Sequence, residues 1–222
     1  MNNVADFLSW VGVALVTLIS IVNPVSTAVL LLSISAQLSN EERNRQITRA
    51  CMYMTAILII FLFAGHLIMF AFRISIPGIR IAGGMVIGYL GFQMLFPEKV
   101  LLSREGKEEA QQKLDISFSP LAMPSLSGPG SIAVVITMSS SINGQHGIDK
   151  IFAFSGVVLA IIITAIVSWL VLRGAGVLRR YLGLNGVDAL SKVMGFLLIC
   201  IGIQFMINGV RDLVLDMGPL VR

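Results

Sequence analysis

The chain is poor in charged side chains. Asp, Glu, Lys and Arg make up only 13% of its 222 residues, whereas hydrophobic residues make up 56%. Soluble domains usually carry about 25% charged residues. Too few polar side chains are present to cover a water-facing surface, so this composition excludes a soluble globular enzyme, a disordered chain and a nucleic-acid-binding protein. It indicates an all-α protein that crosses the lipid bilayer several times.

Cysteine is scarce, and no catalytic or metal-binding pattern is visible. The two cysteines, Cys51 and Cys200, lie far apart in apolar segments and are interpreted as small buried hydrophobic residues. The sequence contains no paired carboxylates, His/Cys metal spacing, phosphate-binding glycine loop or Ser/His/Asp set. We therefore expect no enzymatic activity, no resident cofactor or metal, and no ATP-driven transport by this chain.

Stretches without charged residues predict six transmembrane helices, because a membrane helix needs about 20 apolar residues. They lie near residues 7–32, 50–72, 79–97, 117–141, 151–172 and 190–210. The first and fourth uncharged stretches are longer than one crossing requires. Each contains helix breakers, Asn23-Pro24 in the first and Gly128-Pro129 in the fourth. We expect these two spans to be interrupted helices or re-entrant hairpins.

The distribution of basic residues predicts the orientation. Most of the 16 Lys and Arg lie in the loops that follow spans 1, 3 and 5. Loops rich in Lys and Arg face the cytoplasm. Both termini are then expected on the periplasmic side of a bacterial inner membrane.

The two halves of the chain resemble each other. Pro24-x-Ser26 recurs as Pro129-x-Ser131, and the pattern Gly-x6-Gly-x-Gln occurs at residues 84–93 and again at 195–204. Three spans per half require the second half to enter from the opposite side. The sequence thus predicts two inverted three-helix repeats, residues 1–97 and 117–222, joined by a charged cytoplasmic connector at residues 98–116.

The two interrupted helices predict a binding site. Irregular backbone at membrane depth is tolerated mainly where it lines a cavity, and half-helix N-termini suit carboxylates. The predicted substrate-binding residues are Asn23, Pro24, Ser26, Thr27, Ser127, Gly128, Pro129, Gly130, Ser131, Gln93 and Gln204, and Ser125 adds a hydroxyl. The two glutamines either bond across helices or reach the cavity. Without a buried fixed charge the substrate should be small and net neutral, which fits a small zwitterion.

Four repeated glycines are assigned to helix packing and to movement between the halves. They are Gly84, Gly91, Gly195 and Gly202. Small residues at such positions let membrane helices approach closely.

Six stretches of the sequence resemble the MarC family of bacterial and archaeal integral membrane proteins. They are Ile21-Val22-Asn23-Pro24, Glu42-Arg43-Asn44-Arg45-Gln46, Ile76-Pro77-Gly78-Ile79-Arg80, Pro120-Leu121-Ala122-Met123-Pro124, Gly128-Pro129-Gly130 and Met194-Gly195-Phe196. The resemblance implies an inner-membrane protein of six spans in two inverted halves, related to the amino acid exporter superfamily. It also implies binding of glycine- or alanine-sized amino acids near the two breaks.

We therefore expect a secondary transporter or exporter of small neutral amino acids that works by alternating access. Sodium or a proton would be the coupling ion, and the plan allows a homo-oligomer. Two alternatives stay open: a non-transporting scaffold that binds a partner through residues 104–112, and a small-solute channel. The exact substrate and the direction of transport are not specified by the sequence.

Overall fold

The computed structural model describes residues 3–35, 38–96, 115–143 and 147–217, and these residues form helices without any strand. The all-helical prediction is confirmed for this part of the chain. The helices are α1 (Asn3–Val22), α2 (Pro24–Ile34), α3 (Asn40–Phe72), α4 (Ile76–Leu95), the irregular π-type helix η1 (Ser117–Leu126), α6 (Pro129–Asn143), α7 (Ile148–Arg173) and α8 (Ala175–Met217). Nearly all of the predicted connector, and the stretch 104–112 of the scaffold alternative, lie outside the described residues.

Five helical segments are long and apolar enough to cross a membrane. They are Asp6–Leu32, which combines α1 and α2, Asn40–Phe72, Ile76–Leu95, Ile148–Arg173 and Asp188–Leu215. These segments coincide with five of the six predicted spans. The remaining prediction, residues 117–141, falls on η1 and α6, each of which is shorter than one crossing.

Helix starts are fixed by local capping. The Ser39 hydroxyl accepts a hydrogen bond from the Glu42 N–H at 3.2 Å before α3, and the Ser75 hydroxyl accepts one from the Gly78 N–H at 3.1 Å before α4. Such bonds satisfy donors that have no partner inside the helix. Within α8, Gly183 (φ 65°) bends the chain, and only glycine adopts this conformation without strain.

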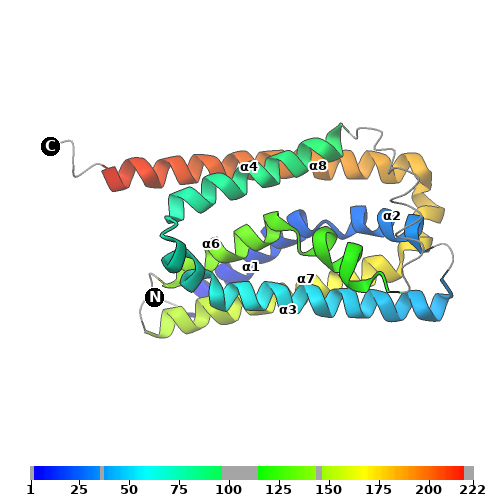
Figure 1. The fold of residues 1–222 in the computed structure, drawn as a ribbon, viewed down its shortest axis with the longest axis horizontal. Coiled ribbons are helices and arrows are strands. Elements are labelled where there is room, and N and C mark those ends of the chain that lie inside the picture. Colours follow the sequence, from blue (N-terminus) through cyan, green and yellow to red (C-terminus); the bar gives the residue numbers. More distant parts are fainter. Residues whose placement is uncertain (1–2, 36–37, 97–114, 144–146, 218–222) are drawn as a thin grey trace.

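The helices run between two ends of an elongated bundle (Figure 1). The α2–α3 and α7–α8 connections, the end of α4 and the start of η1 lie at one end, here called the Ser39 end. The α3–α4 and α6–α7 connections, the start of α1 and the end of α8 lie at the other, the Ser75 end. The helices α4 and α8 form a pair along one side of the remaining helices.

The buried core lies among α1, α3, α6 and α7. Leu18, Leu58, Val134 and Ile161, one from each helix, are fully buried there. By contrast, large apolar side chains cover much of the outer surface, and Phe70 on α3 is 77% exposed. A surface this apolar is suited to contact with lipid rather than water.

Glycines bring α4 and α8 into backbone contact. A Cβ built on Gly84 would lie 2.5 Å from the carbonyl oxygen of Gly202, and one on Gly91 would lie 2.5 Å from that of Gly195. The contacts are reciprocal, because a Cβ on Gly195 or Gly202 would equally collide with Gly91 or Gly84. The structure therefore places all four glycines that were assigned to helix packing in one antiparallel seam, here called the glycine seam.

We expect Gly91→Ala to destabilise the protein by about 1–3 kcal/mol, the usual cost of inserting a methyl group into a packed contact. Gly88→Ala on the same helix is the matched control, because a Cβ at Gly88 meets nothing within 4 Å. Thermal unfolding of both variants in detergent measures the effect. Equal midpoints for the two variants would contradict the close approach at the seam.

Candidate binding cavity

The first break is built by Asn23 and Pro24. Asn23 lies between α1 and α2 in the left-handed conformation (φ 42°, ψ 69°), which asparagine tolerates better than most residues. Its side-chain oxygen accepts a hydrogen bond from the Ser26 N–H at 3.3 Å, and its amide nitrogen donates to the sulfur of Met94 at 3.4 Å. Pro24 fits the first position of α2 because an N–H there would have no helical partner. Asn23 thus ends one helix and caps the next.

The second break follows η1. The Ser127 N–H and hydroxyl both donate to the Ala122 carbonyl at 2.8 Å, which ends η1. The Gly128 carbonyl then accepts from the Ser131 hydroxyl at 2.9 Å and from the Ile132 N–H at 3.1 Å. As in α2, a proline occupies the first position of the new helix, α6.

Both new helices begin with N–H groups that remain available. Among the described residues, the N–H groups of Val25, Gly130 and Ser131 have no hydrogen-bond acceptor. The first N–H groups of a helix carry partial positive charge and attract anionic groups. Each break therefore offers donors for a carboxylate without offering a full charge.

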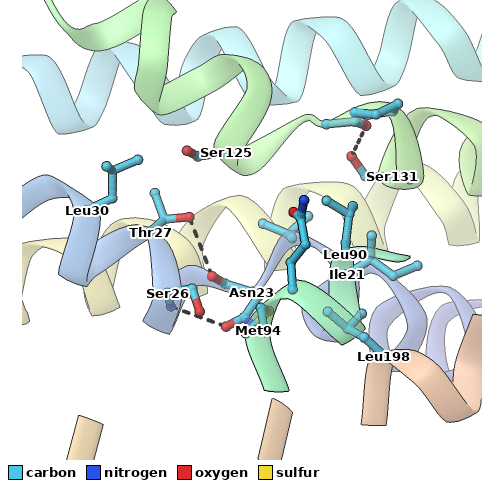
Figure 2. A pocket seen from close by; sticks show the side chains of 15 residues that line it. Ile21, Asn23, Ser26, Thr27, Leu30, Leu90, Met94, Ser125, Ser131 and Leu198 are labelled. Carbon is cyan, nitrogen blue, oxygen red and sulfur yellow. Dashed lines mark hydrogen bonds between the residues drawn. The ribbon is translucent and has the colours of Figure 1, made fainter. Parts of the chain in front are cut away.

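The two breaks face one cavity of about 350 Å³ (Figure 2). Asn23, Ser26 and Thr27 lie on one side of it, and Ser125 and Ser131 lie across from them. The full lining consists of Ile21, Val22, Asn23, Ser26, Thr27, Leu30, Leu90, Gln93, Met94, Ser125, Gly128, Pro129, Gly130, Ser131 and Leu198. The cavity is thus assembled from α1, α2, α4, η1, α6 and α8.

Most of the predicted binding residues come together in this lining. They are Asn23, Ser26, Thr27, Gln93, Gly128, Pro129, Gly130 and Ser131, together with Ser125. Three others lie elsewhere. Pro24 is buried at the start of α2, and the Ser127 hydroxyl is buried against the Ala122 carbonyl. Gln204 is exposed on α8 and donates to the Asn208 side chain at 3.0 Å.

The apolar part of the lining was not predicted. Ile21, Val22 and Leu30 flank the first break, whereas Leu90, Met94 and Leu198 come from the two helices of the glycine seam. Leu90 and Leu198 lie between the seam glycines, but the residue types of this apolar lining do not differ from those that face lipid.

The cavity contains dipoles but no fixed charge. None of its described lining residues is Asp, Glu, Lys, Arg or His, and the polar groups are hydroxyls, amides and backbone. An unpaired charge is costly to hold in such a place, which favours a ligand without net charge. Ligand sites typically measure about 300–1,000 Å³, so this cavity is suited to a small molecule.

The fold and the cavity define a polytopic helical membrane protein with a small polar cavity between two helix breaks. The family model described as "MarC family integral membrane protein" matches residues 8–214. The inner membrane protein MarC of Citrobacter koseri is 40% identical over 221 residues, covering 94% of this chain and 97% of its own. MarC of Escherichia coli strain K12 is 39% identical over 215 residues, with the same coverage of 94% and 97%. The chain therefore belongs to the MarC family of integral membrane proteins, as its motifs predicted. No solved structure matches it.

We expect Asn23→Ala to destabilise the protein by about 1–2 kcal/mol, because it removes a helix cap and places alanine in a left-handed conformation. Asn23→Gly should destabilise the protein by only about a few tenths of a kcal/mol, since glycine accepts this backbone conformation and is tolerated as a cap. Thermal unfolding of the purified variants provides the measurement. A larger loss for glycine than for alanine would show that the backbone conformation is not the constraint at this position.

Proposed function

We propose that this protein is a secondary transporter of small neutral amino acids of glycine or alanine size. It would act in the inner membrane, because its relatives are named inner membrane proteins. The observation that carries the proposal is the uncharged polar cavity faced by two helix breaks. A zwitterion has no net charge but two strongly polar ends. It therefore matches a site that contains oriented donors and acceptors and no ionised side chain.

Different groups of the cavity would bind the two ends of the zwitterion. The free N–H groups of Gly130 and Ser131 would bind the carboxylate at the start of α6. The side-chain oxygens of Ser125 and Gln93 would accept hydrogen bonds from the ammonium group. The cavity of about 350 Å³ is large enough for an amino acid of this size.

We further propose that the six spans form two inverted three-span halves. The contacts of the glycine seam support this, because Gly84 meets the repeat equivalent of Gly91 and Gly91 meets that of Gly84. Such reciprocity is the mark of a two-fold relation. Other contacts come in the same pairs: α1 packs on α7 as η1 packs on α3, and α2 packs on α7 and α8 as α6 packs on α3 and α4. The basic loops would place the Ser39 end in the cytoplasm and both termini in the periplasm.

Alternating access is supported by an asymmetry between the two ends. The cavity reaches Leu90 on α4, whereas Arg80 lies ten residues, or about 15 Å of helix, nearer the Ser75 end. There Arg80 forms an ion pair with Asp212 of α8 and donates to the Ser141 hydroxyl of α6 at 3.2 Å. These contacts tie three helices together and would form a closed outer gate.

Gln93→Leu should raise the KM for labelled alanine or glycine about tenfold in proteoliposomes, because it removes a hydrogen bond to a charged group. Gln204→Leu is the matched control. Gln204 occupies the position in the second repeat that Gln93 occupies in the first, but it lies outside the cavity. The variant should therefore leave KM unchanged.

Uptake by the unmodified protein should saturate with substrate concentration, and sodium or a pH gradient should be varied to identify the coupling ion. Uptake that never saturates would favour a channel. No uptake above that of empty liposomes would contradict transport of these amino acids. Equal effects of the two glutamine variants would contradict the assignment of the cavity and leave transport itself intact.

Reversing either charge of the gate should slow transport about tenfold, because each single change places two like charges side by side between α4 and α8. The variants are Arg80→Asp and Asp212→Arg. The double variant restores an opposite pair in the reverse order and should recover most of the rate. Transport rates in proteoliposomes measure this, and a double variant as slow as the singles would contradict a gating role for the pair.

A further inference from the structure

A second, larger hollow lies on the outside of the bundle, between α3 and α7. It has a volume of about 730 Å³. On α3 its wall is a single stripe from Thr48 to Ile60, and on α7 it is a stripe from Ile162 to Trp169, both at helical spacings of three and four residues. Except for two threonine hydroxyls and the Trp169 indole N–H, the side chains of this wall are largely apolar, so the groove is suited to hydrocarbon.

The length of the groove matches one leaflet of a bilayer. Ile60 follows Thr48 by twelve residues, which is about 18 Å of helix. The hydrocarbon core of a bilayer is about 30 Å thick, so one leaflet contributes roughly 15 Å. An acyl chain that enters beside Thr48 would therefore end near Ile60.

The groove has a polar, cationic mouth at the Ser39 end. The Trp169 indole N–H donates to the Thr48 hydroxyl at 3.0 Å, and the Arg173 guanidinium lies 4.2 Å from the centre of the Trp169 ring. Trp is typical of the interface between hydrocarbon and headgroups. Arg173 is thus held by a ring that itself lines the groove.

Arg173 is a cation at this mouth that, among the described residues, has no ion-pair partner. Arg49 is already paired with Asp115 at 3.4 Å. Hydrogen bonds from the Ser117 hydroxyl and N–H hold the pKa of Asp115 below its usual value, so this carboxylate stays charged at neutral pH. Within the described ranges, no carboxylate lies within ion-pair distance of Arg173.

We propose that this groove binds an anionic phospholipid, with an acyl chain along α3 and the headgroup phosphate on Arg173. Arginine binds phosphate through several N–H groups, and basic pockets between membrane helices select anionic headgroups. A second copy of the chain is a poorer occupant. A two-fold axis through the groove would bring two Arg173 side chains together, and their like charges would repel.

The interface between α3 and α7 continues to the other end of the bundle. A hollow of about 640 Å³ is lined there by α7 from Lys150 to Ile162 and by Phe63 of α3. The two hollows share Ile162, and each has one cation at its outer end, Arg173 or Lys150. The interface between α3 and α7 can therefore accept one lipid from each leaflet.

Tryptophan fluorescence tests the proposal, because the chain has only two tryptophans. In Trp10→Phe, Trp169 becomes the sole reporter and lines the groove. The variant is reconstituted into phosphatidylcholine vesicles that contain brominated phosphatidylglycerol, and separately into phosphatidylglycerol vesicles that contain brominated phosphatidylcholine. Quenching of Trp169 gives the relative affinity of the two lipids. We expect phosphatidylglycerol to bind about fivefold better, the ratio that one cationic side chain near anionic lipid supplies.

Changes at Arg173 decide whether its charge causes the preference. In the Trp10→Phe background, Arg173→Gln should bring the ratio close to one, and Arg173→Lys should keep most of it. Arg43→Gln is the matched control, because Arg43 is a cation at the same end that donates to Asn40 and does not stack on Trp169. Equal quenching by both lipids before any change at Arg173 would overturn the proposal. Absence of quenching by either lipid would also overturn it, and would indicate that protein covers the groove.

Discussion

The backbone at the two helix breaks imposes the constraint on which the rest of the structure depends. Inside a bilayer no water is available, so N–H and C=O groups released from a helix must be bonded within the protein or face a cavity. Asn23 meets this requirement with its own side chain, which caps α2. Ser127 and Ser131 meet it with hydroxyls that bond to the Ala122 and Gly128 carbonyls. Gly130 and Ser131, whose N–H groups remain unbonded, line the cavity, and this concentrates polarity in a chain that is otherwise apolar.

The glycine seam solves a different problem. A cavity between two broken helices needs a third wall, and α4 supplies it with Leu90, Gln93 and Met94. At Gly91 and Gly195 the backbones of α4 and α8 are in contact, so the two helices pack closely as a pair. Arg80 and Asp212 join the two helices at the Ser75 end, and the hydrogen bond from Arg80 to Ser141 connects the pair to α6.

Polar residues and glycines made much of this structure predictable, and apolar residues did not. Asn23-Pro24 and Gly128-Pro129 have strong local meaning, since proline fits a helix start and breaks a helix interior, so both break positions could be read directly. The lining leucines could not be distinguished from those that face lipid. Gln93 and Gln204 have the same local motif yet different surroundings. Their difference depends on how the halves pack, which a repeat pattern alone does not specify.

The positions of the charges connect these features. Arg80 and Asp212 at one end, and Arg49, Asp115 and Arg173 at the other, lie near the ends of helices, whereas the cavity between the two breaks is lined without any ionised side chain. Charges at the ends are near water and headgroups, where they can pair or exchange partners at low cost. A charge in the middle would attract an ion of opposite sign and would hold it too strongly for release. Helix-end dipoles attract a carboxylate more weakly, and for this reason we propose a small zwitterion as the ligand of this cavity.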